Sequence, residues 1–383
     1  MKHNWQYKKL GEICEILNGF AFKSSNYVSH GGIRVIRIAN VQDGYISDEA
    51  PQFYPIGEMH SLGKYLLYEN DLLMSLTGNV GRVALLSKDL LPAALNQRVA
   101  CLRPSRDINK KFLFHFLHNS LFVQDCIKAA KGVAQLNMST EWLKEFPIPL
   151  PPLEEQQLIV AELDRINAVI EDCRQLLRTL DALAQSLFYD SFGDTISNPK
   201  AWPTQPLKQV APASSSKAEP EESNGKFWLL NLDQVESNSG RIIEKQFFSI
   251  QEIGASTVLF DENNVLYSKL RPYLNKVVIP NGRGYCTSEL IPLKPNNLLK
   301  EYLAYSLRLP EFVQYISGKT GGAKMPRVKM NYFWDFQLPV PPLELQQQFA
   351  RRIESIEAQK KEVEKTIATL QTLLDSRMDY WFN

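Results

Sequence analysis

Side chains suited to binding an anionic polymer are concentrated in two segments of this sequence that contain no acidic residue. Residues 263–288 carry Lys269, Arg271 and Lys276 among tyrosines and asparagines, and residues 312–334 carry four further cations around a Gly-Gly pair. Lys and Arg can neutralise phosphates, while Arg, Asn and Gln can recognise base edges in the major groove. One such segment alone is typical of an ordinary solvated surface. Two of them in a duplicated chain favour a nucleic-acid interface.

The other candidate motifs do not indicate catalysis. His115 and His118 form an H-x-x-H pair, but no carboxylate has the spacing of an H-E-x-x-H zinc site, so we interpret both as helix-surface or boundary residues. Phosphate-binding glycine loops and the G-x-S-x-G nucleophile motif are missing. Asn198-Pro199-Lys200 lacks the second proline and the aromatic residue of an adenine methyltransferase motif. The sequence therefore predicts no catalytic residue and no metal site.

The elements that would position these side chains occur twice. Phe146–Gln157 reads FPIPLPPLEEQQ and Phe336–Gln347 reads FQLPVPPLELQQ, an offset of 190 residues. The offset is 197 where Trp5 matches Trp202, and it falls to a constant 190 further along the chain. Loops tolerate insertions and deletions, whereas a helix that must pair along its length does not. We therefore expect a variable domain followed by a helix of fixed register in each copy.

Both helical segments have the apolar spacing of a coiled coil. Pro151-Pro152 and Pro341-Pro342 suit a helix start, and apolar residues then recur in steps of four and three for nearly four heptads, with Lys360 the one polar exception. Two such seams in one chain are expected to bury each other as an antiparallel pair; packing within an ordinary core is the alternative. The predicted seam and subunit-docking residues are Leu163, Ile166, Ile170 and Leu177 in the first copy and Ile353, Ile356, Val363 and Ile367 in the second.

The predicted fold class is α+β with a pseudo-two-fold internal repeat. Short β-branched or aromatic runs near turn-forming residues predict two mixed α/β domains, residues 1–150 and 193–340. Each would be followed by a spacer helix, residues 151–192 and 341–383, and the two helices would form the antiparallel coiled coil.

Composition limits the possible environment and partners. The chain has 43 basic and 42 acidic residues, so local patches and not its net charge of +1 must meet an acidic ligand. Its five cysteines are scattered, which argues against a disulfide framework and a structural zinc site. No segment approaches the roughly 18 uninterrupted apolar residues of a membrane span. We expect a cytoplasmic protein without a membrane partner.

Together these features resemble the specificity subunits of type I restriction-modification systems. The resemblance is carried by the repeated P-L-P-P-L-E-E-Q-Q and P-V-P-P-L-E-L-Q-Q motifs, each placed between a variable domain and a long helix. Leu266–Val277, Ser75–Val83 and Asn96-Gln97 also resemble the target-recognition domains of that family. The similarity covers essentially the whole chain.

The resemblance implies a non-catalytic subunit. Each variable domain would bind one half of a split target in double-stranded DNA, and the helices would space the halves and dock two methyltransferase subunits, with restriction subunits as further partners. No cofactor would be bound by this chain, because S-adenosylmethionine, ATP and Mg²⁺ would belong to the partner subunits.

Within the matched segments, polar and basic residues are the predicted DNA contacts. They are Asn79, Arg82, Gln97, Lys269, Arg271, Tyr273, Asn275 and Lys276. Two other functions remain open from the residues alone. One is a coiled-coil scaffold with two protein-binding heads, whose partner binding would not depend strongly on salt, whereas DNA affinity would fall steeply with salt. The other is a fused enzyme with an unrecognised methyltransferase site.

Overall fold

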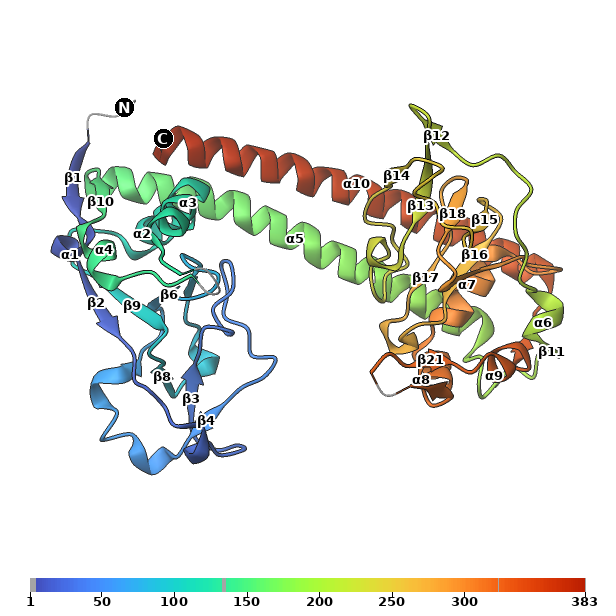
Figure 1. Ribbon diagram of the computed structural model, residues 1–383, viewed down its shortest axis with the longest axis horizontal. Coiled ribbons are helices and arrows are strands. Elements are labelled where there is room, and N and C mark those ends of the chain that lie inside the picture. Colours follow the sequence, from blue (N-terminus) through green and yellow to red (C-terminus); the bar gives the residue numbers. More distant parts are fainter. Residues whose placement is uncertain (1–4, 133–135, 323, 383) are drawn as a thin grey trace. The chain divides into compact units, whose positions relative to one another are not determined.

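The computed structural model describes residues 5–132, 136–322 and 324–382 (Figure 1). It is a mixed α+β structure with an internal repeat, as the sequence predicts. Within the described ranges, no helix combines the length and the apolar character that a bilayer span requires.

The chain divides into two compact units. Unit 1 consists of Met1–Asp172 and Ile367–Asn383, and unit 2 consists of Cys173–Thr366. Each unit therefore contains one mixed α/β domain and one part of each of two long helices, α5 (Leu153–Phe192) and α10 (Leu343–Phe382). Both are uninterrupted helices of 40 residues, about 60 Å long at 1.5 Å per residue. The domain boundaries expected from the sequence stay a prediction.

Unit 1 contains, in its described residues, two four-stranded sheets. The first has the order β2-β9-β6-β7 with antiparallel neighbours, and the second has the order β4-β3-β8-β5 with β3 and β8 parallel. In β6, Leu72 and Met74 pack against the cluster that contains the start of α5, and Leu73 packs into a second cluster on the other face. This alternation follows from the two-residue period of a strand. The strands are β2 (Cys14–Asn18), β3 (Ile33–Ile36), β4 (Phe53–Tyr54), β5 (Leu66–Leu67), β6 (Leu72–Ser75), β7 (Val83–Leu85), β8 (Ala93–Leu95) and β9 (Val99–Pro104); the helices are α1 (Leu10–Ile13), α2 (Lys110–His118), α3 (Ser120–Ala129) and α4 (Thr140–Glu145).

Unit 2 repeats this plan. Its central sheet has the order β17-β16-β19, and a second sheet has the order β12-β13-β18-β15, in which β13 and β18 are parallel. In β16, Val265 and Tyr267 pack against the helices while Leu266 packs into the other cluster, as in β6. The strands are β12 (Glu222–Ser223), β13 (Lys226–Leu230), β14 (Phe247–Phe248), β15 (Val258–Phe260), β16 (Val265–Ser268), β17 (Val277–Val278), β18 (Gly284–Cys286), β19 (Leu290–Leu293), β20 (Thr320–Gly321) and β21 (Arg327–Val328); the helices are α6 (Leu207–Val210), α7 (Lys300–Arg308), α8 (Pro310–Ser317) and α9 (Met330–Trp334), with 3₁₀ turns η5 (Leu232–Gln234) and η6 (Pro272–Leu274).

The first strand of each domain pairs with the strand that precedes the long helix. In unit 1, β1 (Gln6–Lys9) is antiparallel to β10 (Pro147–Leu150), and in unit 2, β11 (Thr204–Pro206) is antiparallel to β22 (Gln337–Pro339). The strands β10 and β22 are the first half of the repeated proline motif. Each domain is thus closed at the point where its chain enters the helix.

A buried glutamine explains part of the motif's repetition. Gln156 and Gln346 are both fully buried, and each donates its side-chain amide to a proline carbonyl five residues earlier, at 2.8 Å. Their Oε1 atoms accept the backbone N–H groups of Asn109 and Leu299, which precede α2 and α7. The same side chain therefore joins the start of the long helix to a shorter helix of its domain.

The two long helices run antiparallel, because within each unit the start of one lies beside the end of the other. In unit 1, Leu163 of α5 shares a core cluster with Met378 of α10, and in unit 2, Phe188 shares one with Phe349. Among the predicted seam residues, Leu163, Ile170, Ile353 and Ile356 are buried, and Ile166, Leu177, Val363 and Ile367 are half-buried.

Candidate nucleic-acid interface

The segment after the central strand has the same backbone frame in both units. In unit 1 the Ser75 N–H donates to the Arg82 carbonyl at 2.9 Å, and in unit 2 the Ser268 N–H donates to the Lys276 carbonyl at 3.1 Å. Both serine hydroxyls also bond to a carbonyl of the following turn. Arg82 and Lys276, two predicted contacts, therefore occupy equivalent positions.

A second pair of equivalent positions follows from the next residue. The Leu76 N–H donates to the Arg98 carbonyl at 3.0 Å, and the Lys269 N–H donates to the Glu289 carbonyl at 2.9 Å. Since these bonds join the end of β6 to the loop before β9, and the end of β16 to the loop before β19, Arg98 of unit 1 corresponds to Glu289 of unit 2.

The turn itself requires left-handed backbone at matched places. The N–H groups of Gly78 and Arg271 donate to the carbonyls of Leu136 and Pro326, at 2.8 and 2.7 Å. Gly78 has a φ of 72° and Arg271 a φ of 49°. Glycine adopts this conformation without cost, whereas an L-residue with a Cβ pays roughly 1–2 kcal/mol. Unit 2 thus places an arginine where the frame favours glycine.

Four of the predicted DNA contacts are exposed to solvent. They are Asn79 and Gln97 in unit 1 and Arg271 and Tyr273 in unit 2. Tyr273 lies in η6, two residues beyond Arg271, with 52% of its surface exposed. Lys269 is half-buried at the end of β16, close to this turn in the chain. The structure therefore gathers the unit 2 predictions Lys269, Arg271 and Tyr273 on one connected segment.

The other predicted contacts have partners inside their own domains. Arg82 donates from Nη1 to Gln42 Oε1 at 2.8 Å, and Lys276 donates from Nζ to the Leu232 carbonyl at 2.7 Å. Burial lowers the pKa of Lys276. Asn275 is buried, and its amide donates to the Arg308 carbonyl at 3.0 Å. Each of these three side chains fixes the turn of its own unit to a neighbouring segment of the same domain.

The eight predicted contacts do not include Arg98 and Asn137, which lie beside Gln97. Gln97 lies in an open recess of about 400 Å³ that Leu76, Thr77, Arg98 and Asn137 also line. Arg98 is adjacent to Gln97 in a polar segment, which is a usable signal. Asn137 reaches the recess through an isolated bridge between Thr77 and Asn137, 60 residues apart, and no local pattern indicates it. Asn79 is brought next to Arg82: with its amide turned so that the oxygen faces Arg82, it accepts from Nη2 at 3.1 Å.

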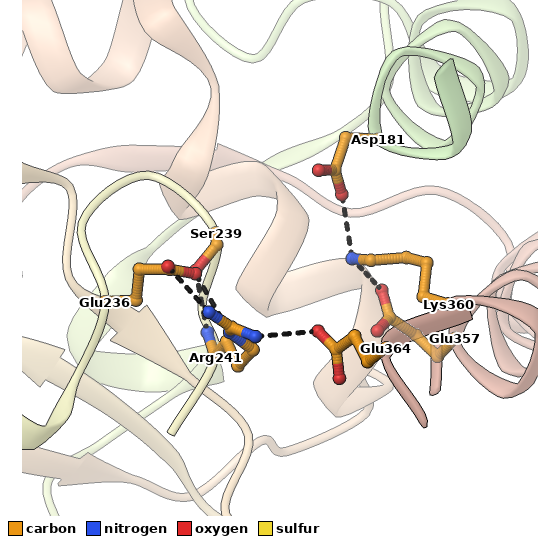
Figure 2. A network of polar contacts seen from close by, with 7 residues as sticks. All are labelled: Asp181, Glu236, Ser239, Arg241, Glu357, Lys360 and Glu364. Carbon is orange, nitrogen blue, oxygen red and sulfur yellow. Dashed lines mark hydrogen bonds and ion pairs between the residues drawn. The ribbon is translucent and has the colours of Figure 1, made fainter. Parts of the chain in front are cut away.

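In unit 2 a network of ion pairs joins the loop after η5 to α10 (Figure 2). Lys276 bonds to η5, and the loop after η5 contributes Glu236 and Arg241. Arg241 pairs with Glu236 at 2.8 Å and with Glu364 of α10 at 3.0 Å. The pKa of Glu236 is lowered, mainly by the hydrogen bond from Arg241. The turn at Arg271 is therefore linked to η5 by the Lys276 hydrogen bond, and the loop after η5 is linked to α10 by the Arg241 ion pair.

The same view shows the one charged position of the seam. Lys360 of α10, whose side chain is 13% exposed, lies 2.7 Å from Asp181 of α5 and 3.1 Å from Glu357 (Figure 2). Burial opposes its charged form, but the hydrogen bond to Asp181 and the two carboxylate charges outweigh it, so the pKa of Lys360 is raised. The polar exception in the heptad pattern is therefore part of an ion-pair cluster.

The histidine pair has structural partners. His115 is buried on α2 and lies 2.7 Å from Asp164 of α5, which also pairs with Lys111. His118 lies 2.8 Å from Asp43. In the part of the chain that the structure describes, no group of three or more His, Cys, Asp or Glu side chains could hold a metal ion.

The duplicated arrangement is that of a known family. The model of the type I restriction modification DNA specificity domain matches residues 2–180 and 199–371. The chain belongs to this family. Over 411 residues it is 22% identical to the putative MjaX specificity subunit of Methanocaldococcus jannaschii, with 97% of this chain and 92% of the relative covered.

Two other specificity subunits match part of the chain. The EcoAI subunit of Escherichia coli is 29% identical over 184 residues, which cover 47% of this chain and 31% of that subunit. The MjaVIII subunit of Methanocaldococcus jannaschii is 31% identical over 173 residues, which cover 44% of this chain and 40% of that subunit. Each match thus spans less than half of the relative's length.

Solved structures share the fold. The type I restriction-modification S subunit from M. genitalium has a TM-score of 0.56 at 14% identity, covering 98% of this chain and 95% of that one. A chain from a study of complex assembly and conformational transition of the type I R-M system has a TM-score of 0.53 at 19% identity, covering 99% and 97%. At these identities the likeness concerns the fold alone.

Proposed function

We propose that this chain is the DNA-recognition subunit of a type I restriction-modification complex and that its two specificity domains bind the two halves of a split target. The observation that carries the proposal is the shared backbone frame with different side chains on it: Gly78 against Arg271, and Arg98 against Glu289. One scaffold that presents different polar groups at matched positions suits two different half-sites, because sequence is recognised by side chains at base edges.

Arg271 supports the DNA assignment for unit 2. Among the described residues its guanidinium makes no hydrogen bond or ion pair, and its side chain is exposed although its backbone has the left-handed conformation. A strained backbone conformation whose side chain makes no stabilising contact within the domain is typical of functional positions. With Lys269 and Tyr273 beside it, the turn offers charge for phosphates, a guanidinium fork for a base edge and an aromatic ring.

We further propose that α5 and α10 dock two methyltransferase subunits, with restriction subunits in a full complex. Several leucines of α5 outside the seam support this, because Leu158, Leu176 and Leu183 are 68%, 46% and 46% exposed. Leu176 and Leu183 are two helical turns apart and share one side of α5, and apolar side chains that repeat on one exposed side of a helix suit a partner protein. Methyl transfer, with S-adenosylmethionine, and any ATP- and Mg²⁺-dependent step then belong to the partner subunits.

Co-expression with a methyltransferase subunit, followed by genome-wide mapping of methylated adenines, tests the proposal. The expected result is a split motif with a fixed gap. No new methylation in a correctly assembled complex would contradict it. The salt dependence of binding distinguishes DNA recognition from the alternative of a protein-binding scaffold. Affinity for DNA should fall steeply between about 50 and 200 mM salt.

A double substitution tests the unit 2 contacts. Lys269→Ala with Arg271→Ala should abolish binding to the cognate site while the fold persists. Lys217→Ala with Lys226→Ala is the matched control, because it removes the same charge from exposed positions of the same domain. Equal affinity of the two double variants in the assembled complex would contradict the assignment.

A further inference from the structure

We propose that the recess of unit 1 binds a guanine edge through Arg98, and that unit 2 has closed the equivalent position with an ion pair and recognises its half-site from the turn at Arg271. This inference rests on the proposed function and extends it, because it names the base, the residue and the difference between the two domains. Arg98 and Asn137 are not among the eight predicted DNA contacts.

The recess has the donors that such a base edge requires. Arg98 is exposed, and among the described residues its guanidinium has no hydrogen-bond or ion-pair partner. Asn137 Oδ1 accepts the Thr77 hydroxyl at 3.3 Å, which fixes the amide at the wall of the recess. Gln97 is exposed beside it. A guanidinium fork matches the O6 and N7 acceptors of guanine, and a carboxamide matches an adjoining base.

The backbone of Arg98 is held in place independently of its side chain. Its carbonyl accepts the Leu76 N–H at 3.0 Å, and its own N–H lies 3.4 Å from Asn96 Oδ1. The first contact ties it to the residue that follows β6, the fully buried central strand. The guanidinium therefore projects from a fixed base, which favours specific over diffuse contact.

Unit 2 has different chemistry at both matched positions. Glu289 stands where unit 1 has Arg98, and Arg327, which forms the bridge with Leu270, stands where unit 1 has Asn137. Arg327 Nη2 lies 2.6 Å from Glu289 Oε1, and Nε donates to Oε2 at 3.3 Å. The Nε and Nη2 edge of the guanidinium is thus engaged by the carboxylate, so this edge can meet a base only if the pair opens.

Each frame consequently leaves one arginine without a partner among the described residues, at a different place. In unit 1 it is Arg98 on the loop before β9, opposite a turn with Gly78. In unit 2 it is Arg271 at the position of Gly78, opposite an occupied Glu289–Arg327 pair. The two domains can therefore use one scaffold and still recognise unrelated half-sites, through arginines on different loops.

Selection of bound duplexes from random DNA tests the inference, with the full chain assembled with its methyltransferase subunits. The variants are Arg98→Gln, Arg98→Lys and Arg271→Gln, and Arg106→Gln is the charge control from an exposed loop of unit 1. Arg98→Gln should lose a guanine preference in one half of the motif and bind the original site about tenfold or more weaker. Arg271→Gln should change only the other half, and Arg106→Gln neither.

Two further measurements separate base recognition from charge. Arg98→Lys keeps the charge but not the planar fork, so it should retain affinity for random DNA and show a weaker guanine preference than the wild type. Replacing that guanine by 7-deazaguanine, which lacks N7, should weaken the wild type and leave Arg98→Gln unaffected. A thermal unfolding curve like that of the wild type is expected for every Arg98 variant.

The outcomes are distinguishable. If the wild type selects no motif, the proposed function fails before any variant is considered. If a motif is selected and Arg98→Gln selects the same one, with affinity lowered equally for all sequences, Arg98 is a phosphate contact and the inference is wrong. A change in both halves of the motif would also overturn it.

Discussion

Arg271 adopts the left-handed backbone conformation that Gly78 adopts at the equivalent position of the other domain. The two N–H groups donate to equivalent carbonyls, those of Leu136 and Pro326. The conformation is therefore set by the backbone frame and not by the side chain. A residue with a Cβ is strained there, and only what its side chain does can favour arginine over glycine.

The match between Arg271 and Gly78 predicts that a glycine at position 271 favours stability but lowers DNA affinity. Arg271→Gly relieves the strain and Arg271→Ala does not, so the glycine variant should have a free energy of unfolding roughly 1 kcal/mol higher than the alanine variant. Both should lose affinity for the cognate DNA to the same extent. Urea unfolding and a DNA-binding titration of the two variants check this. Equal stability would mean that the turn imposes no strain.

The buried motif glutamine predicts a stability difference between neighbouring residues. Gln346→Ala leaves the Pro341 carbonyl and the Leu299 N–H without their buried partner, which should lower the free energy of unfolding by roughly 1–3 kcal/mol. Gln347 is exposed, so Gln347→Ala is the matched control and should change it by less than about 0.5 kcal/mol. Chemical denaturation measures both. Similar values for the two variants would contradict the role of Gln346.

Lys360 predicts how charge is tolerated in the seam. The carboxylates of Asp181 and Glu357 are about half exposed, at 54% and 49%, so they can be rehydrated when the ammonium is removed. Lys360→Met supplies an apolar side chain and should therefore change the free energy of unfolding by less than about 1.5 kcal/mol. Ile170 at the matched position of the first copy is an apolar precedent.

Reversing the charge should have a much larger effect. Lys360→Asp places a third carboxylate beside Asp181 and Glu357 in a poorly solvated position, and it should cost about 3 kcal/mol or more. Melting curves of the two Lys360 variants give the comparison. If both lose the same stability, the ion pair and not the packing governs this position.

Much of the architecture is predictable because it is periodic or repeated. The heptads around Ile353 and the proline motif at Phe336 are local patterns, and they indicate the paired helices and the duplication. The site is harder to predict from the sequence, because sheet pairing brings together residues that are far apart in the chain. Arg327 and Glu289, for example, form an ion pair across 38 residues. The acid-free segment 263–288 also ends directly before an acidic residue, Glu289. This carboxylate neutralises Arg327, a cation of the second acid-free segment.

Side-chain direction is the other missing information. Lys276 and Arg82 have the residue types of DNA contacts, yet both bond to loops of their own domains. Their carbonyls, not their charges, define the shared frame with Ser268 and Ser75. Composition alone cannot separate a cation that faces solvent from one that fastens a loop.

Glu162 predicts a pH dependence at the end of α10 in unit 1. Its carboxylate lies 3.1 Å from Arg377 Nη2 and accepts Trp381 Nε1 at 2.9 Å. The hydrogen bond from Arg377 lowers the pKa of Glu162, burial opposes this, and the Trp381 bond adds to it. A carboxyl whose pKa is lower in the folded state contributes stability above its unfolded pKa, near 4.3, and loses it as the pH falls through the folded value.

Acidification below about pH 4 should therefore weaken the bond between Glu162 and Trp381. The indole N–H resonance of Trp381, in protein labelled at tryptophan, reports this directly and should shift upfield over that range. Asp164 also has a lowered pKa, through His115 and Lys111, so Asp164→Asn is needed as a control and should leave the Trp381 transition in place. Glu162→Gln should lack it. If Glu162→Gln retains the same transition, another acid controls the end of α10.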